Sequence, residues 1–339
     1  MDLEKALRTV EIEPIRSLTF AEVGQIVQNF SQRLTLAFPN SELKLANVME
    51  KMFECHMFLA DIPDNLGNAN YFYKTQAIYF KLNANFETLD DYIVHECIHY
   101  FQDIRDEKRE LQRMGLCRFR EFKIYNMALN EAAVQYITSK ALESKKEEIN
   151  YGGLTIKTTS PKYYPVLTSL MEQIAFLLGD DAVVESTLFS TDRFTFELMD
   201  VIGERNFNKI QSGFDKILEI RQTAYEDIAK QESLIANEYI KIQNILIQEY
   251  FKGALVFVET KDDANEYKRK IENFKDYIKD YDNLKTYEKI KEKQLEKLSK
   301  KTISINKAKM LTVVKHNIFI DLFRKLQEWI FSEEYKIKK

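Results

Sequence analysis

The sequence predicts an α+β fold that is mostly α-helical, and three observations support this. The 339-residue chain has only nine glycines and five prolines, fewer than the turns of an all-β sandwich need. All five prolines lie at or before Pro165, and the stretch that follows is rich in Lys, Glu, Leu and Ile, which favours helices. Between residues 71 and 82, by contrast, Tyr, Phe and Ile predominate, which favours β-structure around residues 76–82.

Helices are predicted at four places in the N-terminal part: 19–34, 41–60, 89–108 and 121–144. Thr88 is the candidate N-cap of the third of these helices. Residues 271–298 repeat apolar side chains in steps of three and four, which predicts a helical hairpin or bundle. We place a boundary at residue 203, with one domain over residues 1–203 and a helical C-terminal domain over residues 204–339.

The composition indicates a folded protein with a solvated surface. Apolar residues make up 45% of the chain, enough to fill a core, and charged residues make up 30%. The net charge is −4, with an acidic excess in residues 1–200 and a smaller basic excess in residues 201–339, where Lys is interleaved with Glu and Asp. Such interleaving is typical of exposed helix faces, and the acidic N-terminal half disfavours nucleic acid as a partner.

The sequence predicts neither export nor a membrane location. No run of 18 or more uncharged apolar residues occurs, and the first residues lack the basic and apolar regions of a signal peptide. The three cysteines, Cys55, Cys97 and Cys117, show no C-x-x-C spacing. We therefore expect no disulfide framework, and the cytoplasm is the predicted location.

Residues His95, Glu96 and His99 form the motif H-E-x-x-H inside the predicted helix 89–108. In a helix, positions i and i+4 lie on the same face one turn apart, so the two imidazoles can hold one zinc ion. The Glu beside the first His then points toward a metal-bound water and can take its proton. The chain has only four histidines, and two of them lie here.

Glu131 is the predicted third ligand of a single Zn²⁺ ion. The apolar positions of the helix around it place Glu131 on the buried face. A buried carboxylate needs a cation or strong donors, which zinc would supply and a salt bridge to Arg or Lys would supply equally. Asp103 is a weaker candidate ligand, because three ligands at i, i+4 and i+8 on a straight helix cannot converge on one ion.

These motifs, H-E-x-x-H at residues 95–99 and N-E-x-x at residues 130–133, resemble the gluzincins, the thermolysin-like clan of zinc metallopeptidases. The resemblance covers roughly residues 70–200. It implies a zincin-like catalytic domain with a small sheet, whose strand before the motif helix commonly holds an extended substrate by its edge. It also implies that zinc binds to both histidines and the downstream Glu, with the motif Glu as general base of peptide-bond hydrolysis.

Two departures from the gluzincin pattern accompany this resemblance. Glu131 follows His99 by 32 residues, a longer interval than in thermolysin-like enzymes. Gln135 stands where those enzymes have an Asp that orients one of the histidines.

Peptide hydrolysis also needs a donor to the negative charge that develops on the carbonyl oxygen. Related zinc peptidases use a Tyr or a His for this role. Tyr163 and Tyr164, which follow the helix of Glu131, are the preferred catalytic candidates. The weaker candidates are Tyr125, Tyr136 and His56, and His316 is predicted to be structural.

Two classes of function follow from the sequence. The favoured class is a zinc-dependent peptide-bond hydrolase that acts on a peptide or protein substrate through metal-activated water and the Glu96 base. The alternative is a non-enzymatic interaction or scaffold protein with an inert or structural zinc site. In either class the C-terminal helices are a possible binding surface for a protein partner.

Overall fold

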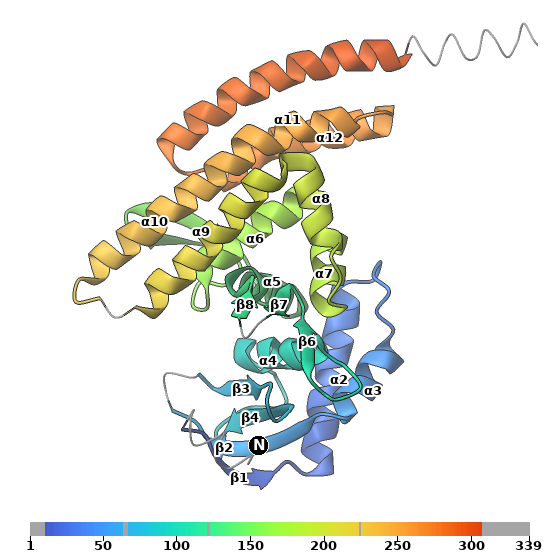
Figure 1. Cartoon of the computed structure of the whole chain (residues 1–339), viewed down its shortest axis with the longest axis vertical. Helices are drawn as coiled ribbons and strands as arrows, with labels where there is room; N and C mark the ends of the chain where they lie inside the picture. The colour runs from blue at the N-terminus through green and yellow to red at the C-terminus, as the bar shows by residue number, and fades with distance from the viewer. Residues whose placement is uncertain (1–10, 64–66, 121–122, 224, 307–339) are drawn as a thin grey trace, which may run out of the picture.

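The computed structural model describes residues 11–63, 67–120, 123–223 and 225–306. The fold is mixed α+β with small sheets and many helices, so the predicted class is confirmed at this level. In Figure 1 the N-terminal sheet lies at one end of the molecule, a layer of helices lies in the middle, and a pair of C-terminal helices covers the other end.

The N-terminal sheet has four strands in the order β1-β2-β4-β3. Its strands are β1 (Glu13–Ser17), β2 (His56–Asp61), β3 (Ala69–Phe72) and β4 (Ala77–Lys81). Strands β2 and β4 are parallel, whereas the other two pairs are antiparallel, and β3 lies at the edge. Helices α2 (Phe20–Ala37) and α3 (Leu45–Phe53) connect β1 to β2, and a capping box of Thr19 and Glu22 begins α2.

Helix α4 (Asp91–Phe101) carries the H-E-x-x-H motif and packs against β3, β4 and helix α5 (Met127–Ala141), which carries Glu131. A second four-stranded sheet lies between α4 and α5 in the sequence. Its strands are β5 (Asp103–Arg105), β6 (Leu111–Met114), β7 (Cys117–Arg120) and β8 (Lys123–Tyr125), all antiparallel. This inserted sheet accounts for the long interval between His99 and Glu131.

The rest of the described chain is helical apart from one hairpin. The hairpin strands are β9 (Glu147–Tyr151) and β10 (Leu154–Thr158). The helices that follow are α6 (Pro165–Leu178), α7 (Asp180–Leu188), α8 (Arg193–Ile202), α9 (Glu204–Gln222), α10 (Ile228–Ile245), α11 (Phe251–Ala254), α12 (Lys261–Asn273) and a helix over 281–306. A π-helical turn (Leu246–Tyr250) and two 3₁₀ turns (Leu255–Phe257 and Phe274–Tyr277) adjoin α11 and α12.

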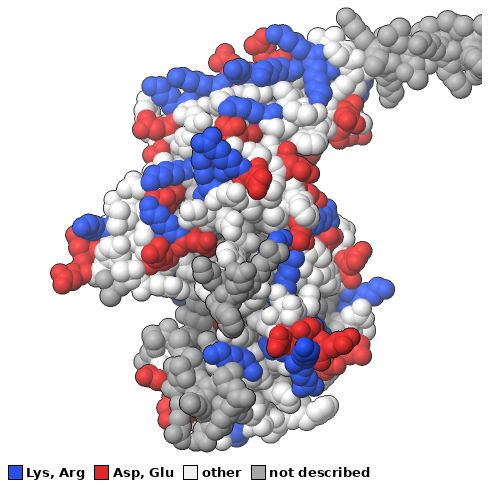
Figure 2. Space-filling model, viewed as in Figure 1, with Lys and Arg blue, Asp and Glu red and all other residues white. Residues whose placement is uncertain are grey.

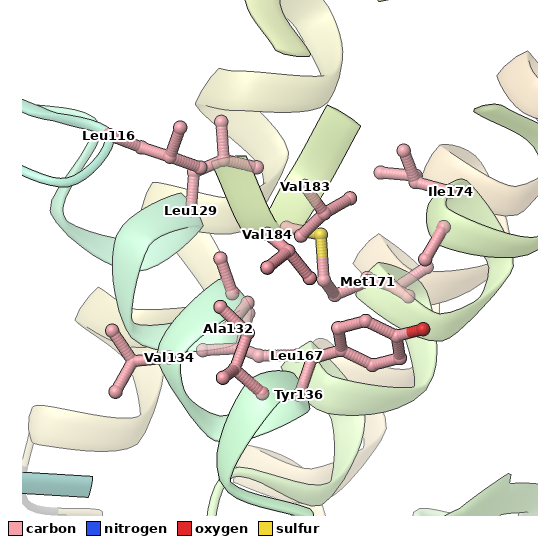
Figure 3. Packing of buried hydrophobic residues seen from close by; sticks show 14 of the residues in the cluster. Leu116, Leu129, Ala132, Val134, Tyr136, Leu167, Met171, Ile174, Val183 and Val184 are labelled. Atoms are coloured by element: carbon pink, nitrogen blue, oxygen red, sulfur yellow. The ribbon is translucent and has the colours of Figure 1, made fainter. Parts of the chain in front are cut away.

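The core is continuous from the N-terminal helices to the C-terminal ones. One cluster of buried apolar side chains extends from Leu18 to Leu298. Figure 3 shows its central part, where side chains of α5, α6 and α7 interdigitate. Because α9 also packs against α5, residues on both sides of position 203 surround the helix that carries Glu131.

Several predicted helices are shorter than expected because strands interrupt them. The helix predicted over 41–60 ends at Phe53, and residues 56–61 form β2, where parallel pairing with β4 overrides helix propensity. The helix predicted over 89–108 begins with Asp90 as its N-cap, not Thr88, because the Asp90 carboxylate accepts a hydrogen bond from Ile93 N–H at 3.0 Å.

The same helix ends at Phe101, and strand β5 begins two residues later, at Asp103. There the Asp103 carboxylate accepts hydrogen bonds from Arg105 and from the Tyr71 hydroxyl, which hold it in the strand. The helix predicted over 121–144 is confined to α5, since strand β8 occupies residues 123–125.

The C-terminal hairpin was predicted correctly in type. Helix α12 and the helix over 281–306 turn back on each other, and most of the predicted apolar stripe is buried. The buried members of the stripe are Ile271, Phe274, Ile278, Tyr287 and Leu298. Tyr281 was assigned to this stripe wrongly, since it is 74% exposed at the start of the second helix.

The surface of these C-terminal helices carries both signs of charge. Figure 2 shows Lys and Arg beside Asp and Glu over this end of the molecule. Several of these charges form ion pairs along one helix, such as Arg269 with Glu266 at 2.7 Å. None of the helices in the described part of the chain combines the length and the apolar character that a membrane crossing requires.

Candidate metal centre

Helix α4 brings the two histidines of the motif onto one buried face. His95 and His99 are 1% and 6% exposed, and their ring centres lie 4.6 Å apart. The spacing of four residues places the rings one above the other, as the 3.6-residue turn requires. Their Nε2 atoms are 2.9 Å apart and therefore point at the same small space.

Helix α5 supplies the third group. Glu131 Oε2 lies 3.2 Å from His95 Nε2, and Glu131 Oε1 lies 3.4 Å from His99 Nε2. The potential ligand atoms of the three residues all lie within 4.8 Å of one another. The structure thus brings together the three residues that the sequence predicted as metal ligands.

Hydrogen bonds on the far side of His95 determine which ring nitrogen carries its proton. The Ser160 hydroxyl donates to the carbonyl of Tyr163, so Ser160 Oγ accepts from the Gln135 amide N–H at 2.9 Å. Gln135 therefore presents its oxygen, Oε1, to His95 Nδ1 at 2.8 Å. Because an amide oxygen only accepts, His95 carries a proton on Nδ1, which leaves Nε2 as the ring nitrogen that can bind a metal ion.

This tautomer makes the site fit a cation. Nε2 of His95 and the carboxylate of Glu131 point at the same small space, where one cation would be bound by both. Two imidazoles and one carboxylate are the ligand set of many catalytic zinc sites.

The side-chain amide of Gln102 contacts His99 on the side away from Glu131, and Gly115 leaves space for that amide. The Gln102 amide lies 2.8 Å from His99 Nδ1 through its nitrogen, and its buried oxygen Oε1 has no hydrogen-bond partner. A half-turn of this amide would let Oε1 accept a proton from Nδ1, which frees Nε2 for a metal. Gly115 leaves room for the amide, because a Cβ there would lie 2.2 Å from Oε1, and its φ of +58° also favours glycine.

Glu96 lies beside the three ligands and is almost fully buried, with 7% of its surface exposed. Its Oε2 accepts a hydrogen bond of 2.7 Å from the backbone N–H of Tyr71 on strand β3. Burial raises the pKa of Glu96 to about 7, although the nearby His95 and the Tyr71 N–H oppose the rise. A carboxylate with a pKa near neutrality can both take and return a proton.

Glu96, His99 and Glu131 line a cleft of about 560 Å³. Its walls come from the loop before β3, from β3 and β6, from α4 and α5, from the segment before α6, and from the end of α9. The residues that line it are Gly67, Asn70, Tyr71, Tyr73, Tyr92, Glu96, His99, Met114, Met127, Glu131, Lys162, Tyr163, Tyr164, Leu218, Arg221 and Gln222. A second cavity, of about 530 Å³ between α8 and α12, contains none of the predicted site residues.

Tyr163 and Tyr164, the preferred oxyanion candidates, both line the cleft. Their ring centres are 5.1 Å and 6.3 Å from the centre of the His95 ring. Burial raises the pKa of both phenols, so each keeps its proton at neutral pH and can donate a hydrogen bond. Tyr164 has a left-handed backbone, with φ of +49°, at the N-cap of α6.

The weaker candidates lie elsewhere. The Tyr136 hydroxyl donates to Asp180 at 2.6 Å, and its ring packs against α6 (Figure 3). Tyr125 and His56 are exposed and do not line the cleft. Asp103 is paired with Arg105 at 2.8 Å and is not part of the ligand group. His316 lies outside the described residues.

Sequence reasoning missed several residues of the cleft. Tyr92 belongs to the motif helix itself, and its ring centre lies 4.8 Å from that of Tyr163. The spacing of Tyr92 three residues before His95 is the signal that could have identified it. Arg221 gave no such signal, since it lies 122 positions after His99 and reaches the cleft only because α9 packs on α5.

The contact between Gln135 and His95 gives a first prediction. We expect Gln135→Leu to weaken zinc binding by about 10- to 100-fold, because His95 loses the acceptor that fixes its tautomer. Zinc affinity measured by competition with a chromophoric chelator tests this. Gln243→Leu is the matched control, since Gln243 is an equally buried glutamine in α10, outside the cleft. Equal zinc affinity of the two variants would contradict the prediction.

Comparison with known proteins adds no family to this picture: no family model matches the chain, and neither curated proteins nor solved structures include a significant match.

Proposed function

We propose that this protein is a zinc-dependent peptide-bond hydrolase. The observation that carries the proposal is the convergence of His95, His99 and Glu131 within 4.8 Å, with His99, Glu131 and the buried Glu96 lining an open cleft. A structural zinc site has four protein ligands and no open position, whereas a catalytic site has three and leaves room for water and substrate. Among the described residues, the group has three members.

Each residue of the site has a role in this proposal. Zinc bound by the three ligands would act as a Lewis acid that lowers the pKa of water and polarises a carbonyl. Glu96 takes the proton of the attacking water on Oε1, while its Oε2 stays bonded to Tyr71 N–H, and then delivers the proton to the leaving amine. Tyr163 or Tyr164 donates a hydrogen bond to the negative charge that develops on the carbonyl oxygen.

The arrangement of the elements supports a zincin-like catalytic domain. Strand β3 is an edge strand, and Asn70 and Tyr71 from it line the cleft next to helix α4. The Tyr71 N–H at this edge donates to Glu96, and the other main-chain groups of such an edge can bind an extended peptide. Helix α5 then supplies the third ligand from the opposite side, as the resemblance to gluzincins implies.

The three cysteines favour a cytoplasmic location within this proposal. Cys55, Cys97 and Cys117 are all buried and all free. Burial raises the pKa of each of these thiols, which keeps them protonated and unreactive. Buried thiols that form no disulfide are typical of proteins from reducing compartments.

A cleavage assay with metal control tests the proposal. We expect the purified protein to contain about one zinc per chain, and to cleave members of a broad peptide library, as read by mass spectrometry. A chelator should abolish cleavage and added zinc should restore it, because the chemistry depends on the metal. Bound zinc without cleavage of any peptide would favour the alternative, an interaction protein with an inert zinc site. Absence of bound metal would contradict both.

A further inference from the structure

Arg221 brings into the cleft a positive charge that the proposed chemistry does not use. It lies in the last turn of α9, is exposed to solvent and lines the cleft. Its Cζ lies 4.6 Å from the centre of the Tyr164 ring, so the guanidinium rests on that ring. Within the part of the chain that the structure describes, no carboxylate lies within ion-pair distance of this guanidinium.

Arg221 lies close to the predicted metal ligands, through its contact with Tyr164. The Tyr164 ring that holds the guanidinium is itself 6.3 Å from the ring of His95, measured between centres. Two ring contacts in series thus connect Arg221 to a predicted zinc ligand. The two distances together set an upper limit on the separation of the guanidinium from the His95 ring, roughly the length of three residues of an extended peptide.

The charges of the cleft favour an anionic group at this position. Its two carboxylates are Glu96 and Glu131, and both face the metal site. A divalent cation would offset their charge, which leaves Arg221 and Lys162 as the net charge of the walls. Guanidinium offers a planar pair of donors that matches a carboxylate, and stacking on Tyr164 restricts its motion before the ligand arrives.

We propose that Arg221 binds a carboxylate of the substrate, within about three residues of the cleaved bond. This inference rests on the proposed peptide hydrolysis and adds a substrate class to it. The carboxylate is either the C-terminus of the peptide or an acidic side chain, and the two sources share the same chemistry. Arg221 is therefore a specificity-determining residue rather than a catalytic one.

Binding of three matched peptides to the Glu96→Gln protein tests the proposal without turnover. The peptides share one core sequence, chosen from the cleavage library or, if nothing is cleaved, a mixed apolar sequence. The first ends in a free acid, the second in an amide, and the third in an amide with a Glu near the end. We expect the free acid or the Glu peptide to bind at least about tenfold more tightly than the plain amide, by fluorescence polarisation.

The variant Arg221→Gln should remove this preference, so that the three peptides bind within about twofold of one another. The control is Arg205→Gln, the same substitution at an exposed position of the same helix that does not line the cleft. It should keep the preference. Equal binding of all three peptides to the protein with Arg221 intact would overturn the proposal, as would a preference that survives Arg221→Gln.

The outcomes separate this inference from the proposed function. If peptides are cleaved but the free-acid, amide and Glu peptides are all cleaved equally well, the hydrolase remains and the carboxylate site is wrong. If no peptide is cleaved, yet acidic peptides bind through Arg221, the carboxylate site remains and the hydrolase is wrong. In a cleaving protein, Arg221→Gln should raise KM for acidic peptides with little change in kcat, because the contact is made equally in ground and transition states.

Discussion

Glu96→Gln is expected to keep its zinc and to lose peptide hydrolysis by about 10²- to 10⁴-fold, the range expected for loss of a general base. The substitution removes the proton acceptor but preserves the shape of the side chain. The amide oxygen can still accept the 2.7 Å hydrogen bond from Tyr71 N–H, so the side chain keeps its place. Steady-state cleavage of a library-derived peptide, together with zinc content by elemental analysis, measures both parts of the prediction.

Glu172→Gln is the matched control for this experiment. Glu172 is also a buried carboxylate, 3% exposed, and it also accepts a hydrogen bond of 2.7 Å from a backbone N–H, that of Thr159. It lies outside the cleft. We expect this variant to retain activity, with any effect confined to stability. Full activity of Glu96→Gln would mean that another group removes the proton.

The parts of the site that could be predicted are those that depend only on residues close together in the sequence. His95, Glu96 and His99 lie within one turn and a half of a single helix, so their relative positions follow from helix geometry alone. Glu131 was predicted because a buried acid requires a partner. Its convergence with the histidines depends on the packing of α4 on α5, which the resemblance implied and the spacing could not determine.

The parts that could not be predicted depend on contacts between distant segments. The strands of both small sheets are three to six residues long, too short for a clear alternation of apolar and polar side chains. Strand β2 forms because it pairs with β4, and this pairing cannot be inferred from the sequence of residues 56–61 alone. Arg221 enters the cleft for the same kind of reason, from beyond the predicted boundary at residue 203.

Gln135 shows how a departure from the gluzincin pattern can keep a hydrogen bond to a histidine. The gluzincins, which the motifs resemble, have an acidic residue at this place to orient a histidine, and the amide oxygen of Gln135 likewise accepts from His95 Nδ1. An amide cannot fix its own orientation by charge. Here Ser160 does so, since it accepts from the Gln135 nitrogen and leaves the oxygen for His95. Gln135 therefore holds His95 without a second buried charge.

Glu131→Ala is expected to weaken zinc binding by more than about 100-fold. This exceeds the effect expected for Gln135→Leu, which removes only a hydrogen bond to the ligand His95. The loss has two causes: one of three ligands disappears, and so does the only negative charge among them. Zinc content after dialysis and chelator competition measure it. Asp103→Ala is the control, because Asp103 is held by Arg105 and Tyr71 and should not affect zinc. Tight zinc binding by Glu131→Ala would assign the third ligand to another group.

Thermal unfolding adds a readout for the same variant that depends on neither activity nor chelator. A ligand that binds only the folded state stabilises it, by about 2.7 kcal/mol at 100 times its Kd. Zinc should therefore raise the Tm of the unmodified protein and leave that of Glu131→Ala nearly unchanged. Without zinc the Tm values of the two proteins should lie closer together, because the unmodified protein then lacks the contribution of the bound metal. A zinc-dependent Tm rise of equal size in both proteins would show that Glu131 does not hold the ion.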